Sequence, residues 1–216
     1  MTEEELEHLI RASGAIINDD AVIVIGSQSI LPWLRRFANK VGKEPPQDLV
    51  VSMEADIIPI DNDPHKSDLI DGSIGEETLF HKTFEIYAQG VSLETARAPA
   101  GWQSRCYPLK SRRTNGIVGY CMHPADLFVA KTMAGRPKDG AFLNAMIRYG
   151  LVREKTVRHL VAKVPGLSEE EITEVRKKIA VRFEACEQRE AGEKTLAETK
   201  DQAVQEPQAG PRLRLR

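Results

Sequence analysis

Apolar positions in the first half of the chain recur with two different periods, which predicts both helices and strands. The β-branched run from Val22 to Ile25 ends at Gly26, which is typical of a buried strand closed by a turn. Apolar residues at helical spacing predict a helix before this run, over 2–12, and another after it, over 29–41. Further strands are predicted over 50–60, 84–89, 103–109 and 117–122.

After residue 123 the pattern changes to helices, which are predicted over 125–134, 137–149, 153–164 and 168–190. Beyond residue 190 apolar residues become sparse, and the stretch is too polar to bury a core. We therefore expect an α/β core (α+β, with a small mixed sheet flanked by helices) over 1–123. A C-terminal helical part over 124–190 and a disordered tail over 191–216 are expected to follow it.

Composition narrows the setting in which this protein works. The 216 residues contain no apolar run long enough to span a bilayer, and the acidic N-terminus is unlike a secretory signal. Three cysteines lie far apart in the sequence, which argues against a disulfide framework or a zinc site. These features predict a cytoplasmic protein without a membrane segment.

The net charge of −2 conceals two oppositely charged segments. Residues 44–85 contain eleven acidic and two basic side chains, whereas residues 105–138 contain seven basic and one acidic. Either segment alone is more often a solvated face. Together they are compatible with a metal site beside a phosphate site.

Gly26 and Ser27 stand where the first strand turns into a helix. A glycine allows close approach of a ligand to the backbone, and a helix N-terminus offers free amide donors to a phosphate. Such a dipeptide is also common in turns that have only a structural role. Both a phosphate site and a structural turn therefore stay open.

Glu54 and Asp56 alternate along the predicted strand 50–60 and therefore project to the same side. Two neighbouring carboxylates repel each other, and a cation between them relieves that repulsion. Mg²⁺ suits such a pair because it binds few carboxylates and keeps positions for substrate phosphates. The alternative is an exposed face of an edge strand.

Lys131 lies in an otherwise apolar helix just before a helix break at Gly135-Arg136-Pro137. Lys138 and Asp139 follow directly. Lys131 either extends to solvent, pairs with Asp126 or Asp139, or reaches a ligand.

Together these three segments resemble the minimal nucleotidyltransferases of the DNA polymerase beta-like superfamily. The likeness is greatest to the bacterial group that contains the AbiEii-type toxins of toxin–antitoxin systems. It rests on the segments 22–28, 52–57 and 123–139, and it spans about residues 22–146.

The resemblance implies a nucleotidyltransferase fold that moves a nucleotide from a nucleoside triphosphate, such as ATP, to an RNA (tRNA) or protein acceptor. Glu54 and Asp56 would hold Mg²⁺ or Mn²⁺, and Lys131 and Asp139 would complete the catalytic set. The triphosphate would be bound by Gly26, Ser27, Gln28, Lys131, Arg136 and Lys138. An antitoxin protein is a further implied partner.

Two departures from the superfamily pattern leave alternatives open. The usual third carboxylate on a later strand has only Glu85 as a counterpart among the predicted strands, and the first metal ligand is glutamate rather than aspartate. A nucleotide- or RNA-binding module that has lost the chemistry is therefore the first alternative. A metal-dependent nuclease that uses the same acids is the second.

Overall fold

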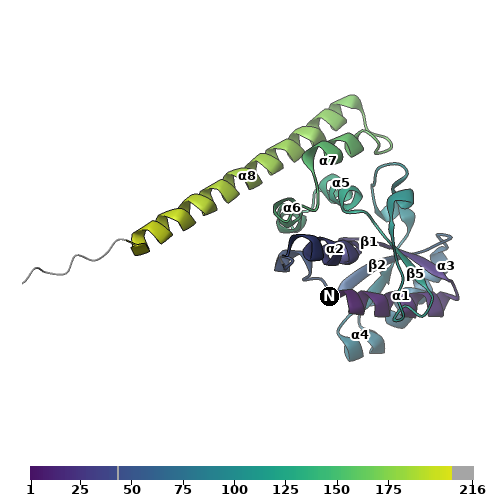
Figure 1. The fold of residues 1–216 in the computed structure, drawn as a ribbon. Coiled ribbons are helices and arrows are strands. Elements are labelled where there is room, and N and C mark those ends of the chain that lie inside the picture. The colour runs from purple at the N-terminus through teal and green to yellow at the C-terminus, as the bar shows by residue number, and fades with distance from the viewer. Residues whose placement is uncertain (43, 206–216) are drawn as a thin grey trace, which may run out of the picture.

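The structure, a computed structural model, describes residues 1–42 and 44–205. Five strands form one mixed sheet in the order β3-β2-β1-β5-β4 (Figure 1). The strands are β1 (Ala21–Ile25), β2 (Glu54–Pro59), β3 (Tyr87–Gly90), β4 (Tyr107–Leu109) and β5 (Val118–Cys121). The predicted fold class, a small mixed sheet with flanking helices and a helical C-terminal part, is confirmed.

The central strand β1 is the apolar run from the sequence, and its last four residues are buried. It pairs antiparallel with β2 and parallel with β5. Its last residue, Ile25, lies opposite Asp56 of β2, and Asp56 in turn lies beside Gln89 of the parallel strand β3. The pairing thus brings the C-terminal end of β1 next to Asp56 of β2, at one end of these interior strands.

Helices cover the sheet on both sides (Figure 1). Helix α1 begins with a capping box of Thr2 and Glu5. It packs on four of the strands beside α3. In the helical part, α5 packs against α6, α7 and α8. The helices are α1 (Glu3–Ile17), α2 (Leu31–Val41), α3 (Pro64–Ile74), α4 (Leu79–Phe84), α5 (Pro124–Ala134), α6 (Asp139–Arg148), α7 (Glu154–Val161) and α8 (Glu169–Gln205).

The sheet and the helical part share one hydrophobic core, which runs from α1 through β1 to α5 and α8. Phe128 of α5 is fully buried, and its ring lies 5.9 Å from that of Phe183 of α8. Because the apolar sides of both parts meet, α5 and α6 are held at a defined position over the edge of the sheet.

Four strands are shorter than the sequence predicts, and β5 is so by only one residue at each end. Before β2, the amino group of Met1 donates hydrogen bonds to the carbonyls of Val50 and Ser52 (2.7 and 3.0 Å), which occupies groups that a strand partner would need. Phe84 ends helix α4 instead of opening a strand. Residues 102–105 form a 3₁₀ turn ahead of β4.

Helix α8 differs most from the prediction. The sequence predicts that the last helix ends at residue 190 and that a disordered tail follows, but α8 continues to Gln205, so the prediction is wrong for residues 191–205. Glutamate, lysine, alanine and glutamine are strong helix formers, and local propensity sustains a helix without burial. The remainder of the expected tail, residues 206–216, lies outside the described residues.

Helix α8 runs past the rest of the molecule (Figure 1). Across the described residues, no helix combines the length and the apolar character needed to cross a bilayer.

Candidate functional site

A cleft of about 850 Å³ lies between helices α5 and α6 and the end of the sheet where β1 finishes beside β2. The predicted catalytic, metal and nucleotide-binding residues all line it, although they come from three separate segments of the chain. They are Gly26, Ser27, Gln28, Glu54, Asp56, Lys131, Arg136, Lys138 and Asp139. The fold therefore gathers the three motifs around one space.

Gly26 forms the turn that connects β1 to the 3₁₀ turn Ser27–Ile30, which leads directly into α2. Its φ of 66° and ψ of −168° belong to a region that only glycine occupies readily. A Cβ at this position would overlap the Oδ2 of Asp56. The glycine is therefore required both by the turn and by the carboxylate that approaches it.

Gln28 follows in the same turn and forms part of the wall of the cleft. Its side chain is 1% exposed, and neither atom of its amide hydrogen-bonds with any described residue. A buried amide without partners is costly, so such groups in folded proteins usually meet a ligand or water.

Glu54 and Asp56 project from β2 toward the cleft, whereas Ala55 between them is buried on the opposite side of the strand. Burial, followed by repulsion from Glu54, raises the pKa of Asp56 to about 6. Lys131, Arg136 and Lys138 act in the opposite direction, but they do not offset these two effects. Asp56 is thus a partly buried carboxylate without enough positive charge around it.

This carboxylate pair fits a hard divalent cation. Two carboxylate oxygen donors in a polar cleft suit Mg²⁺, which binds through one or two carboxylates and retains water or phosphate ligands. Among the described residues, no group of three or more histidine, cysteine or acidic side chains is arranged to hold a metal ion, and the cleft offers the pair Glu54 and Asp56 for this role.

Lys131 and Asp139 form an ion pair across the turn from α5 to α6, with Nζ 2.6 Å from Oδ1. Their side chains are 17% and 8% exposed, and Lys131 Nζ also lies 4.9 Å from the ring centre of Phe142. Of the alternatives for Lys131, the structure therefore contains the Asp139 pair. That pair fixes the ammonium in the wall of the cleft, where it still faces the carboxylates of β2.

Arg136 and Lys138 are exposed at the mouth of the cleft, and neither forms an ion pair with any described residue. Two cations without counter-ions next to Lys131 provide a positive wall opposite Glu54 and Asp56. Such a wall is suited to phosphate oxygens.

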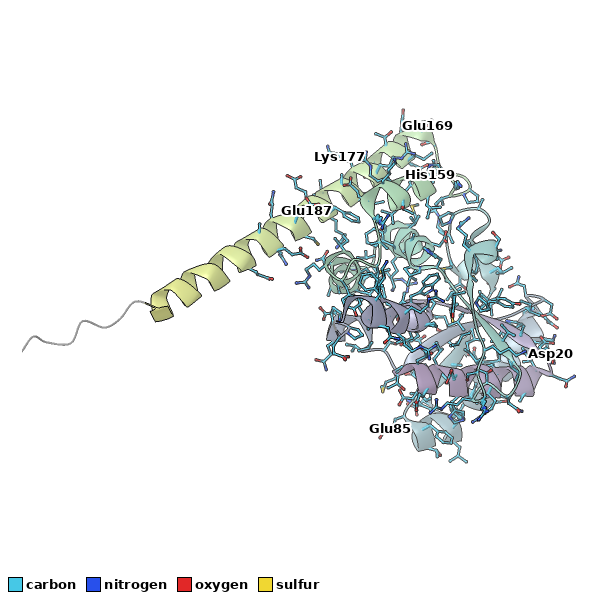
Figure 2. The ribbon with its side chains drawn as sticks, in the orientation of Figure 1. Asp20, Glu85, His159, Glu169, Lys177 and Glu187 are labelled. Atoms are coloured by element: carbon cyan, nitrogen blue, oxygen red, sulfur yellow. The ribbon has the colours of Figure 1, made fainter. Side chains whose placement is uncertain are left out.

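Glu85, the expected counterpart of a third carboxylate, is not in the cleft. It ends α4 in a left-handed conformation with a φ of 58°. Figure 2 shows it beside α4, near α1 and away from α5. The later strand that flanks β2 is β3, and it places Gln89 beside Asp56 and into the lining of the cleft.

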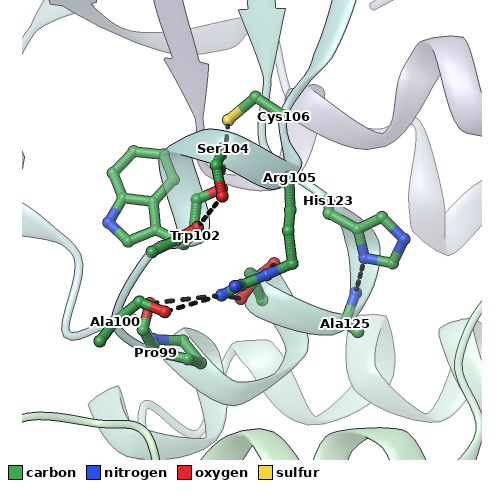
Figure 3. A network of polar contacts seen from close by, with 10 residues as sticks. Pro99, Ala100, Trp102, Ser104, Arg105, Cys106, His123 and Ala125 are labelled. Carbon is green, nitrogen blue, oxygen red and sulfur yellow. Dashed lines mark hydrogen bonds and ion pairs between the residues drawn. The ribbon is translucent and has the colours of Figure 1, made fainter.

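Only part of the basic segment 105–138 faces the cleft. Arg105 makes a bidentate ion pair with the fully buried Asp126 (2.7 and 2.9 Å). It also donates to the carbonyls of Pro99 and Ala100 (Figure 3). This network ties the loop before β4 to the start of α5 and is structural.

His123 is structural as well. Its Nδ1 accepts a hydrogen bond from the backbone N–H of Ala125 and so caps α5 (Figure 3). Its ring packs edge-on against Trp33, with centroids 4.7 Å apart. The ring therefore supports the position of α5 from behind the cleft.

Sequence reasoning missed Arg97 and Asp48, which also line the cleft. Arg97 lies in a loop outside both charged segments, so neither charge pattern nor motif spacing identified it. Asp48 belongs to the acidic segment, but it sits in a 3₁₀ turn that the pattern did not predict.

Comparison of this chain with protein-family models, with curated proteins and with solved structures finds no match.

Proposed function

We propose that this protein is a metal-dependent nucleotidyltransferase that uses a nucleoside triphosphate and acts in the cytoplasm. The observation that carries the proposal is the position of Asp56. Its carboxylate lies beside Glu54, against the backbone of Gly26, and across the cleft from cations of the α5–α6 turn. Acids on one wall and bases on the other are what a metal-bound triphosphate requires.

Each residue has a physical task in this proposal. The turn at Gly26 and Ser27 would present to a phosphate the first backbone amides of the helical segment that follows, which lack intrahelical partners. Lys131, fixed by Asp139, neutralises phosphate oxygens, and the exposed Arg136 and Lys138 do the same nearer the mouth. Transfer of a phosphoryl or nucleotidyl group depends mainly on such positioning and charge neutralisation.

Glu54 and Asp56 would hold the metal ion, whose bound charge neutralises the phosphates and aligns an attacking hydroxyl. The resemblance to nucleotidyltransferases and the separation of charge in the cleft support the same conclusion. Three free thiols, at Cys106, Cys121 and Cys186, suit a reducing compartment.

A binding module that has lost the chemistry is the second candidate. Gln89 favours it, because an amide stands where a third carboxylate would lie beside Asp56. This candidate predicts binding of triphosphate without turnover.

The test is incubation of the purified protein with each of the four labelled triphosphates and Mg²⁺, with total RNA as acceptor and with protein alone. Label should enter one acceptor, and Asp56→Ala should abolish this. Asp68→Ala is the matched control, because Asp68 is an exposed acid of α3 outside the cleft.

Binding without transfer by any triphosphate would favour the second candidate over the enzyme. Release of nucleotides from RNA in the absence of triphosphate would identify a nuclease instead. Equal loss of transfer in Asp56→Ala and Asp68→Ala would contradict the assignment of the cleft.

A further inference from the structure

A second hollow, which we call the α8 groove, runs between α8 on one side and α5 and α6 on the other. Its volume is about 840 Å³. Figure 2 locates Lys177, one of its lining residues, on α8. The groove is lined by six basic side chains but only one acidic side chain, Glu174. The basic residues are Lys131, Arg136, Lys177, Lys178, Arg182 and Arg189.

Most of this positive charge is not neutralised within the protein. Arg182 donates to the carbonyl of Gly140 (3.2 Å) and to Oδ1 of Asn144 (2.7 Å), both of which are neutral acceptors. Lys177 and Arg189 are exposed, and neither forms an ion pair with any residue of the described chain. Two of the six cations are paired: Lys178 with Glu174 at 2.7 Å, and Lys131 with Asp139 at 2.6 Å.

The basic residues of α8 form a stripe rather than a scattered surface. Lys177, Val181, Ala185 and Arg189 follow one another at intervals of four residues and all line the groove, so they form one inclined row along α8. At 1.5 Å per residue, the lining segment from Glu174 to Arg189 extends over about 22 Å. A stripe of this length has room for several successive phosphates of one strand.

The α8 groove adjoins the cleft. Lys131 and Arg136 line both spaces, at the turn from α5 to α6. A chain that lies in the groove therefore passes the same two cations that face the cleft. This shared lining distinguishes the groove from a basic surface elsewhere on the molecule.

We propose that the α8 groove binds the phosphodiester backbone of a single-stranded nucleic acid, and that one end of this strand reaches the cleft. Its role as an acceptor site rests on the proposed function, whereas the binding itself does not. The lining contains apolar side chains such as Leu143 and Val181 that suit sugars and bases, while the cations suit the phosphates.

The test is fluorescence anisotropy with fluorescein-labelled oligouridylate and oligothymidylate of twelve nucleotides, measured with EDTA and without triphosphate. We expect saturable binding that weakens with salt. In Lys177→Gln/Arg189→Gln, affinity near 0.1 M salt should fall about tenfold. The slope of log affinity against log salt should become shallower by about 1.4, because each phosphate contact contributes about 0.7 for single strands.

Lys82→Gln/Lys163→Gln is the matched control, since it removes two exposed charges outside the groove. It should retain the affinity and slope of the unmodified protein. The two oligonucleotides identify whether the strand is RNA or DNA, and binding of either supports the proposal. Absence of saturable binding to both, or equal loss in the control variant, would overturn it. Equally tight binding of polyglutamate would overturn it in favour of an acidic protein partner.

The proposal and the proposed function can fail separately. If the protein binds oligonucleotides but never incorporates a nucleotide, the groove proposal is supported and the proposed enzymatic function is contradicted. If the protein labels itself or another protein but binds no oligonucleotide, the enzymatic function is supported and the groove proposal is contradicted.

Discussion

Gly26 and Asp56 lie in direct contact across the β1–β2 pairing, so that the carboxylate occupies the space where any other residue would carry its Cβ. This contact joins the two segments of the candidate site most tightly. It places the strand proposed to hold the metal ion against the turn proposed to receive phosphate. A displacement of the Gly26 turn would therefore also displace the Asp56 carboxylate, and the reverse.

Gly26→Ala tests this contact. The backbone conformation at Gly26 is strained for alanine, and the new methyl group displaces the Asp56 carboxylate. We expect the free energy of unfolding to fall by about 2–3 kcal/mol. Stabilisation of the protein by Mg²⁺ in thermal unfolding should also be lost.

Gly72→Ala serves as the control for Gly26→Ala. Gly72 lies inside α3 with open space around its Cα. Alanine is a better helix former, so the control should be neutral or more stable by up to about 1 kcal/mol. Equal stability of Gly26→Ala and the unmodified protein would contradict the close approach of Asp56.

Asp56→Asn should stabilise the metal-free protein at neutral pH. In the unfolded chain this carboxyl ionises near pH 4, but burial and Glu54 raise its pKa to about 6 in the fold. The fold therefore opposes ionisation, and its stability decreases as the pH rises from about 4 to about 6. This loss amounts to at most about 3 kcal/mol, and asparagine removes it.

Chemical denaturation with EDTA at pH 4 and pH 7.5 measures this effect. The two proteins should differ little at pH 4, whereas the asparagine variant should be more stable at pH 7.5. Mg²⁺ should then stabilise only the unmodified protein. A less stable variant at pH 7.5 without metal would show that Asp56 is a structural carboxylate.

Much of this site could be predicted from the sequence because its key residues sit in regular local contexts. Glu54 and Asp56 share a side of β2 by simple alternation, and Gly26 ends an unmistakable apolar strand. Gln89 could not be predicted, because its place beside Asp56 depends on the register of β3. Arg97 reaches the cleft from a loop, and hydrophobic periodicity does not predict the path of a loop. The scarcity of apolar residues past residue 190 predicts no buried helix, but the strong helix formers there continue α8 to Gln205.

Gln28→Leu should separate stability from binding. The buried amide of Gln28 has no partner in the described structure, so an apolar side chain of similar size removes a desolvation cost. We expect a gain of about 1 kcal/mol in the free energy of unfolding. Affinity for triphosphate, measured by calorimetry, should decrease at the same time.

The matched control for Gln28→Leu is Gln103→Leu, because Gln103 is exposed and outside the cleft. It should leave triphosphate affinity unchanged. If Gln28→Leu binds triphosphate as tightly as the unmodified protein, the amide has no role in the ligand site.

Lys131 and Asp139 should show strong coupling in a double-mutant cycle. Lys131→Met leaves the Asp139 carboxylate, with only 8% of its side chain exposed, without its cation. We expect this single variant to lose about 3 kcal/mol, and Lys131→Met/Asp139→Asn to recover part of that loss. Urea denaturation of all four proteins measures the coupling, and additive effects would contradict the pair. Both variants that lack Lys131 should bind triphosphate weakly.

Gln89→Asp addresses the missing third carboxylate directly. The register of β2 and β3 puts this side chain beside Asp56, so an aspartate there adds an oxygen ligand to the pair. We expect Mg²⁺ to bind at least tenfold more tightly, as measured by calorimetry, while the metal-free protein becomes less stable through repulsion among three acids.

Gln103→Asp adds the same charge at an exposed position outside the cleft and should change neither quantity. If absence of a third carboxylate limits the chemistry, Gln89→Asp should also raise nucleotide transfer above that of the unmodified protein. Unchanged Mg²⁺ affinity in Gln89→Asp would show that β3 does not face the metal position. Tighter Mg²⁺ binding without any nucleotide transfer would support the second candidate function, a binding module that has lost the chemistry.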